Sequence, residues 1–273
     1  MHVGVAISRD MNDTRMPPPK LNSCAIKDTR ANRAQFTVLA HTCGVASTQA
    51  EQVTIAVNET VQISGLIQLP ARARWCFVLA HGAGAGMRHP FMAAVADGLA
   101  DLGIASLRYQ FPFAERRARR PDSPRISHET VRAAVAKAAQ LAPRLPLIAG
   151  GKSFGGRMTS QAQASSALPA VRGLAFLGFP LHPPEQPSIQ RAEHLFQVQV
   201  PMLLLQGTRD AFAQLQLLEP LVQSLGTRST LNLVVDADHS FRVPARSGRS
   251  DSDARAAMLQ ALADWADSLL ARP

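Results

Sequence analysis

The stretch that decides the fold is Gly150–Met158, which reads GGKSFGGRM and follows the short apolar run Leu145–Ala149. Within it, Gly151–Gly155 fits the pattern G-x-S-x-G, in which a serine lies on a tight turn between a strand and a helix. Such a turn brings other parts of the chain close to the serine, and glycines two positions before and after it remove Cβ atoms that would clash. The pattern therefore predicts that Ser153 projects from the edge of a sheet, at the start of a helix.

A second glycine-rich turn, His81–Gly86, follows the apolar run Trp75–Ala80, which is too short for a helix and is typical of a buried strand. If Ser153 attacks a carbonyl group, the oxygen of that group becomes negatively charged and needs hydrogen-bond donors. The sequence offers the backbone N–H of Phe154, at the start of the predicted helix, and the N–H of Ala83 in this turn. We expect these two groups to form an oxyanion hole.

Glycine-rich turns also bind phosphate groups, but neither turn completes a nucleotide-binding pattern. The dinucleotide pattern G-x-G-x-x-G fails after Gly84, because His89 stands where the last glycine belongs. The P-loop pattern G-x-x-x-x-G-K-[ST] fails because Pro146 stands where its first glycine belongs. The two turns therefore favour acyl chemistry over nucleotide binding.

Two further polar residues follow predicted strands. Asp210 comes after the apolar strand Met202–Gly207, and His239 comes after Leu231–Val235. The carboxyl ends of parallel strands meet at one edge of a sheet, so we expect Ser153, Asp210 and His239 to form a catalytic triad there. The order Ser, Asp, His along the chain is also the order that accompanies a G-x-S-x-G turn.

Neighbouring residues leave alternatives open. Asp236 and Asp238 are rival partners for the histidine, although Asp238 is disfavoured because adjacent side chains on an extended stretch point apart. We expect the side chain of Lys152 to point into solvent. The alternative is that its ammonium group raises the positive charge beside the candidate nucleophile. We expect His81 to shape its glycine-rich turn, while His182, in a proline-rich loop, either lines the pocket or caps it.

These motifs together resemble an α/β-hydrolase of the dienelactone-hydrolase-like group, over the range from about Glu51 to the C-terminus. Within that group the chain is most similar to the hydrolase-like domain of the testis-expressed protein family and of a subunit of the nonspecific-lethal chromatin complex. The segments that carry the resemblance are HGAG (His81–Gly84), LRYQFPF (Leu107–Phe113), GKSFGGRM (Gly151–Met158), FPLHPP (Phe179–Pro184), LQGTRD (Leu205–Asp210) and DHSF (Asp238–Phe241). One departure is Ala211, where the family often has proline. The resemblance implies serine-hydrolase chemistry and leaves the substrate unassigned.

The alternation of strands and helices predicts an α/β fold, the α/β-hydrolase fold, with a mostly parallel central sheet flanked by helices on both faces. We expect an antiparallel strand pair at Val53–Val57 and Val61–Leu69. Helices are expected at His89–Leu102 and at Ser127–Leu141, the second capped by its first residue. The segment Phe179–Val200 is short and rich in proline, so no large lid domain is expected over the pocket.

The chain of 273 residues carries a formal net charge of +9, which raises the question of a polyanionic partner. Its densest basic cluster, Arg116–Arg120, lies in a loop with few aromatic residues, so we expect it to be solvated and expect no nucleic-acid partner. Three cysteines are too few for a disulfide framework and show no zinc spacing, which indicates a reducing, cytoplasmic setting and no metal. No apolar run approaches the roughly 18 residues of a membrane-spanning helix, so no membrane insertion is expected.

The first 50 residues lack sustained hydrophobic periodicity and are expected to be a disordered extension. Within them, Phe36–Ala40 is either a short strand or has no regular structure. Residues 51–273 are long enough for a single α/β-hydrolase domain with its own core. The sequence as a whole predicts a serine hydrolase that cleaves a small carboxylic ester through an acyl-enzyme, without a cofactor. A catalytically weak hydrolase-like module for binding or scaffolding is the alternative.

Overall fold

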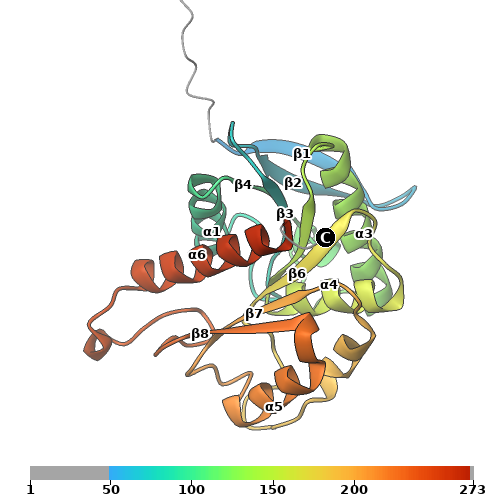
Figure 1. Ribbon diagram of the computed structural model, residues 1–273. Coiled ribbons are helices and arrows are strands. Elements are labelled where there is room, and N and C mark those ends of the chain that lie inside the picture. The colour runs from blue at the N-terminus through green and yellow to red at the C-terminus, as the bar shows by residue number, and fades with distance from the viewer. Residues whose placement is uncertain (1–48, 271–273) are drawn as a thin grey trace, which may run out of the picture. The chain divides into compact units, whose positions relative to one another are not determined.

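One mixed sheet organises the chain in the computed structural model, which describes residues 49–270 (Figure 1). Its eight strands lie in the order β1-β2-β4-β3-β5-β6-β7-β8. Strand β1 (Glu51–Ala56) pairs antiparallel with β2 (Gln62–Gln68), and β2 pairs antiparallel with β4. All other neighbouring strands are parallel. The predicted extension, with its possible strand at Phe36–Ala40, lies outside the described residues except for its last two positions.

The remaining strands are β3 (Trp75–Ala80), β4 (Ile104–Tyr109), β5 (Leu147–Lys152), β6 (Val171–Leu177), β7 (Met202–Gly207) and β8 (Ser229–Val234). The bounds of β3 and β7 are those predicted, because both strands are buried along their whole length and read as apolar runs, with Gln206 near the end of β7 as the one polar side chain. Strand β5 begins two residues later than predicted and extends to Lys152. The strand therefore carries the chain up to the candidate nucleophile without a linker.

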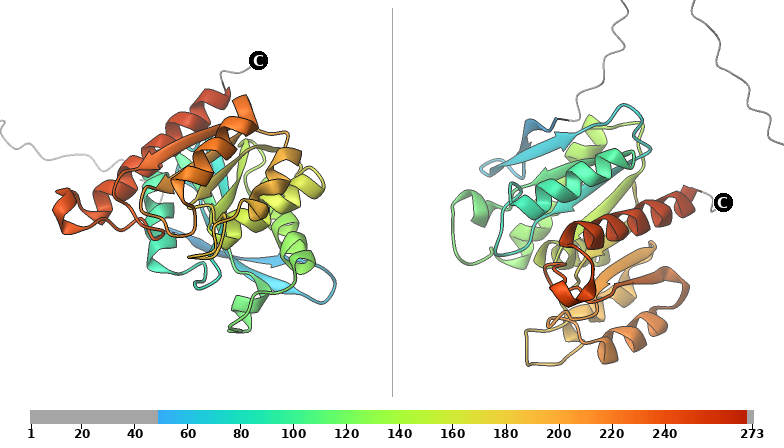
Figure 2. Two further views of the ribbon diagram at one scale, coloured as in Figure 1. Left: turned by 90° about the horizontal axis from the view of Figure 1, so that it is seen from below. Right: turned by 90° about the vertical axis from the view of Figure 1, so that its left-hand side faces the viewer.

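Helices cover both faces of the sheet, which confirms the predicted α/β architecture. Helices α1 (Pro90–Asp101) and α6 (Asp251–Leu270) pack on each other and on one face, as the right-hand view of Figure 2 shows. The other face carries α3 (Pro124–Leu141), α4 (Phe154–Ser165), α5 (Leu215–Leu225) and the 3-10 helix η1 (Gln190–Gln197). Three short elements, α2 (Pro112–Glu115), η2 (Gly226–Arg228) and η3 (Ala245–Ser247), lie in the connections.

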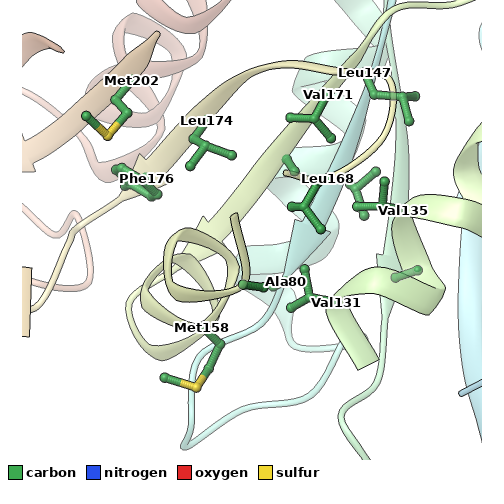
Figure 3. Packing of buried hydrophobic residues seen from close by; sticks show 14 of the residues in the cluster. Ala80, Val131, Val135, Leu147, Met158, Leu168, Val171, Leu174, Phe176 and Met202 are labelled. Carbon is green, nitrogen blue, oxygen red and sulfur yellow. The ribbon is translucent and has the colours of Figure 1, made fainter. Parts of the chain in front are cut away.

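The core under the G-x-S-x-G turn is built by side chains of α3, α4 and the neighbouring strands (Figure 3). The helices contribute Val131 and Val135 of α3 and Met158 of α4 to the same core cluster as Leu147 and Phe176 of the sheet. All five side chains are almost fully buried. Burial of a side chain of this size contributes roughly 1.5–3 kcal/mol to folding. Helix α4 is therefore held firmly against the sheet directly below the turn that carries Ser153.

Helix α3 begins at Pro124, so the prediction that Ser127 caps this helix is wrong. Ser123 occupies the N-cap position, and Ser127 is buried in the first turns of the helix. Proline is favoured at the first helical position because its fixed φ suits the helix and its missing N–H would have no partner there. This preference places the start of α3 three residues before the position predicted.

The segment Phe179–Val200 contains no helix other than η1, so the absence of a large lid domain is confirmed. Among residues 49–270, no helix is long and apolar enough to cross a membrane.

Candidate active site

Ser153 lies in the turn between β5 and α4, in a strained backbone conformation with φ of 48° and ψ of −113°. A Cβ atom added at Gly151 would lie 2.1 Å from the carbonyl oxygen of Ala80, and one added at Gly155 would lie 2.6 Å from the Cβ atom of Ala80. The steric reason inferred for both glycines is thus confirmed. Neighbouring strand β3 passes so close to the turn that side chains on either glycine cannot fit.

The three residues expected to meet form one chain of hydrogen bonds. The Nε2 atom of His239 lies 2.9 Å from Ser153 Oγ, and its Nδ1 atom lies 2.6 Å from Asp210 Oδ2. With the ring proton on Nδ1, the imidazole donates to Asp210 and its Nε2 atom accepts from the serine hydroxyl group. The three residues follow β5, β7 and β8, so one edge of the sheet assembles them.

The rival carboxylates lie elsewhere. Asp238 Oδ1 accepts hydrogen bonds from the backbone N–H groups of Ser240 and Arg242. Asp236 is half-buried and forms no hydrogen bond with the imidazole of His239. Both residues therefore belong to the hydrogen bonding of the turn after β8. Asp210 is the carboxylate that bonds to the histidine.

Gln206 holds Asp210 in place, a role that the sequence did not suggest to us. Its Nε2 atom donates to Asp210 Oδ2 at 2.5 Å, while its Oε1 atom accepts from the N–H of Phe179 at 2.9 Å. The N–H of Phe212 donates to Asp210 Oδ1 at 2.8 Å. These bonds orient a carboxylate whose side chain is fully buried. The available signal was a single amide side chain at the end of the otherwise apolar strand β7.

Lys152 does not point into solvent, so that expectation is wrong. Its Nζ atom is buried, forms no hydrogen bond within the described part of the chain, and lies 5.6 Å from the ring centroid of Phe241. Burial lowers the pKa of the ammonium group to about 8, an effect that the charges of Asp210 and Asp238 partly offset. The reason is local space, because Gly178 has no side chain and its added Cβ would lie 3.1 Å from Nζ.

His81 fixes the second glycine-rich turn, as expected. Its Nδ1 atom lies 2.7 Å from the carbonyl oxygen of Gly82, and its Nε2 atom accepts from the N–H of Phe111 at 3.0 Å. Burial lowers the pKa of this imidazole to about 4, so the ring is neutral at physiological pH. The turn presents Ala83 beside Ser153, where both residues line the same two cavities.

The two cavities meet at Ser153. The larger has a volume of about 750 Å³ and is lined by His239, Phe241 and residues of the turn after β3. The smaller has a volume of about 420 Å³ and is lined by Phe154, Arg157 and residues of the segments after β4 and β6. His182 lines neither cavity, because its ring bonds to the backbone of Pro183 and Gln214. A molecule with its reacting carbonyl group at Ser153 can thus extend in two directions.

The basic cluster Arg116–Arg120 lies beside the smaller cavity and is exposed. Arg116 forms an ion pair with Asp122, and both Pro121 and Asp122 line the cavity. No group of three or more metal-ligating side chains occurs within residues 49–270.

Comparison with known proteins assigns the chain to a family. Residues 73–267 match the family described as "Alpha/beta hydrolase domain", and the chain belongs to it. Its fold is similar to that of dienelactone hydrolase from Anabaena variabilis, with 22% identity, a TM-score of 0.64, and coverage of 80% of this chain and 96% of that one. A serine hydrolase without a lid from Xanthomonas campestris is similar at 21% identity and a TM-score of 0.63, over 80% and 95% of the two chains. Est1E from Butyrivibrio proteoclasticus, solved with ferulic acid bound, is similar at 13% identity and a TM-score of 0.61, over 81% and 100%.

Proposed function

We propose that this α/β-hydrolase is a serine hydrolase that cleaves a small carboxylic ester through an acyl-enzyme. The observation that carries the proposal is the chain of hydrogen bonds from Ser153 through His239 to Asp210, at the junction of two cavities. A serine hydroxyl group is a weak nucleophile unless a base accepts its proton, and an imidazole oriented by a carboxylate is such a base.

The reaction proceeds in two balanced steps. Ser153 Oγ attacks the ester carbonyl carbon while its proton passes to His239 Nε2, and the imidazolium then gives that proton to the departing alkoxide as the alcohol leaves. A water molecule next gives a proton to the same nitrogen and attacks the acyl-enzyme. The proton returns to Ser153 Oγ as the carboxylic acid departs. Asp210 stabilises the imidazolium in both steps and keeps its own charge.

The N–H groups of Phe154 and Ala83 are the proposed oxyanion hole. Phe154 is the first residue of α4, where a backbone N–H has no partner inside the helix and the helix dipole favours negative charge. Ala83 lies on the turn fixed by His81 and lines both cavities beside the serine. Removal of one such donor typically slows an acyl transfer by about 10²–10³-fold.

Labelling with a fluorophosphonate tests the proposal, because this reagent phosphonylates only a serine that a neighbouring base activates. The wild-type protein should be labelled, and Ser153→Ala and His239→Ala should not. Ser240→Ala is the matched control, since Ser240 also lines the larger cavity but should not react. A wild-type protein that resists labelling while it remains folded would favour the alternative, a binding or scaffold module like that of the chromatin-complex subunit that the motifs resemble.

A further inference from the structure

The smaller of the two cavities at Ser153 is lined by two arginine side chains that the chemistry proposed above does not use. Arg157 belongs to α4, one helical turn after Ser153, and Arg191 belongs to η1. A hydrogen bond of 2.7 Å between Ser160 and His194 ties η1 to α4. The two guanidinium groups are therefore brought to one cavity by packed elements.

Neither guanidinium group has a partner in the described part of the chain. Within residues 49–270, neither Arg157 nor Arg191 donates a side-chain hydrogen bond or forms an ion pair, and the Nε atom of Arg157 is buried without an acceptor. Burial and the charge of Arg191 both lower the pKa of Arg157, which shows that the two cations act on each other. Asp122 is an acid lining the same cavity. Its Oδ1 atom accepts a hydrogen bond from Arg116, and its Oδ2 atom is buried without a hydrogen-bond partner among residues 49–270. The ion pair with Arg116 offsets its charge and leaves Arg157 and Arg191, within that range, as unpaired cations at this cavity. A buried donor without a partner is costly, so this arrangement suits a bound anion.

The position of His239 indicates which half of the ester enters this cavity. The departing alkoxide must receive its proton from His239 Nε2, so the alcohol half has to lie on the side of the imidazole. His239 lines the larger cavity and not the smaller one. The alcohol half therefore occupies the larger cavity, and the acyl half extends past Phe154 toward Arg157.

We propose that the acyl half of the substrate carries an anionic group that Arg157 and Arg191 bind. The substrate class is a half-ester of a short dicarboxylic acid, or an acyl ester with another acidic group at the same end. This assignment rests on the proposed esterase function and specifies its substrate. Two guanidinium groups provide the paired donors that a carboxylate accepts best.

Three matched esters test the assignment: monoethyl succinate, ethyl butyrate and the butyrate ester of glycolate. All have a four-carbon acyl chain, and they differ in whether a carboxylate stands on the acyl half, on neither half or on the alcohol half. Hydrolysis is followed as acid release at constant pH, and each rate is divided by the alkaline hydrolysis rate of the same ester. We expect kcat/KM for monoethyl succinate to exceed that for ethyl butyrate by about tenfold or more, the scale of a charge-assisted hydrogen bond.

Arginine variants test whether Arg157 and Arg191 cause the preference for monoethyl succinate over ethyl butyrate. Arg157→Gln and Arg191→Gln should each reduce the succinate-to-butyrate ratio by about tenfold, while Arg157→Lys should keep part of it. Arg172→Gln is the matched control, because Arg172 is an exposed arginine of β6 outside both cavities, and it should leave the ratio unchanged. High salt should lower the wild-type ratio through screening.

The outcomes separate this inference from the function on which it rests. Ser153-dependent hydrolysis of both ethyl esters at equal rates would overturn the anionic subsite and leave the esterase function intact. A preference for the glycolate ester would also overturn it, because the anion would then lie on the alcohol side. If the protein hydrolyses no ester, the esterase function fails. In that case thermal stabilisation by succinate, lost in Arg191→Gln, would still support the anion site, and its absence would overturn that as well.

Discussion

Lys152 directly precedes Ser153 in the chain, yet its ammonium group is buried near the imidazole of His239 and the carboxylate of Asp210 instead of lying in solvent. The Cβ atom that Gly178 lacks would lie 3.1 Å from Lys152 Nζ and 3.5 Å from both Asp210 Oδ2 and His239 Nδ1, so all three atoms border one small space. The charge of Asp210 attracts this cation and partly offsets the effect of burial on the pKa of Lys152. Burial is still costly, because the ammonium group has no hydrogen-bond acceptor in residues 49–270.

This cost makes the stability of the protein depend on pH. The pKa of Lys152 is about 8 in the folded protein, against 10.5 for an ordinary lysine. Between these values the unfolded chain binds more protons than the folded protein, so stability rises with pH through this window. From pH 7 to pH 10, the free energy of unfolding of the wild type should rise by about 2–3 kcal/mol relative to Lys152→Met, at ~1.4 kcal/mol per pKa unit.

Urea denaturation of both proteins at several pH values measures the difference. Lys137→Met, on the outer helix α3, is the matched control, and its stability difference from the wild type should stay constant over the same range. If the difference for Lys152→Met is equally constant, the ammonium group is solvated in the folded protein.

At the scale of elements, the junction of β5 and α4 decides where the candidate nucleophile, Ser153, lies. Buried side chains fix both elements, so the turn between them cannot relax without moving the sheet or the helix. The positive φ of Ser153 is the strain that results. The same rigidity supplies an N–H of Phe154 in a fixed direction, which an oxyanion hole requires.

Gly151→Ala should destabilise the protein strongly. The new Cβ would lie 2.1 Å from the carbonyl oxygen of Ala80, and φ at this position is +147°. We expect a loss of more than about 3 kcal/mol, which lowers the melting temperature of a domain of this size by roughly 10 °C. Gly84→Ala is the control, because a Cβ there meets nothing within 4 Å, and calorimetry should show a nearly unchanged melting temperature. Equal melting temperatures for the two variants would mean that β3 does not pack tightly against the turn at Ser153.

At the scale of the whole molecule, residues 49–270 place the candidate site at one edge of a single sheet, and no inserted domain interrupts this part of the chain above the site. The larger cavity is walled by the connections after β3 and β8, and the smaller by those after β4 and β6 together with α4 and η1. An acyl chain that enters the smaller cavity meets the two guanidinium groups instead of an apolar channel. The architecture therefore limits how much of a long acyl chain can be buried.

Neutral p-nitrophenyl esters should be hydrolysed best when the acyl chain has about two to four carbons, because each further methylene gains roughly 0.8 kcal/mol only if it is buried. A series from acetyl to palmitoyl esters, with Ser153→Ala as the blank, gives kcat/KM as a function of chain length. Activity should also show no increase at a lipid interface, since no lid needs to open. A kcat/KM that climbs steadily to palmitoyl would show that another segment covers the acyl chain.

The sequence alone determined the elements and the candidate triad. Apolar runs such as Trp75–Ala80 predict strands, and the glycine spacing around Ser153 predicts the tight turn between β5 and α4. Both signals depend only on residues near one another in the chain. Parallel strands bring their carboxyl ends to one edge whatever their spacing, so the meeting of Asp210 and His239 with the serine could also be predicted.

Only the tertiary structure decided which charges are buried and which are paired. Gln206 orients Asp210 because the chain turns back after β7. Lys152 is buried because Gly178, at the end of β6, leaves room for its ammonium group. Arg191 lines the same cavity as Arg157 because η1 packs on α4. Each of these contacts joins segments whose relative positions are set by the packed sheet and helices. Desolvation and pairing depend on that packing and leave no periodic signal in the sequence, which is why a lysine expected in solvent is buried beside the candidate triad.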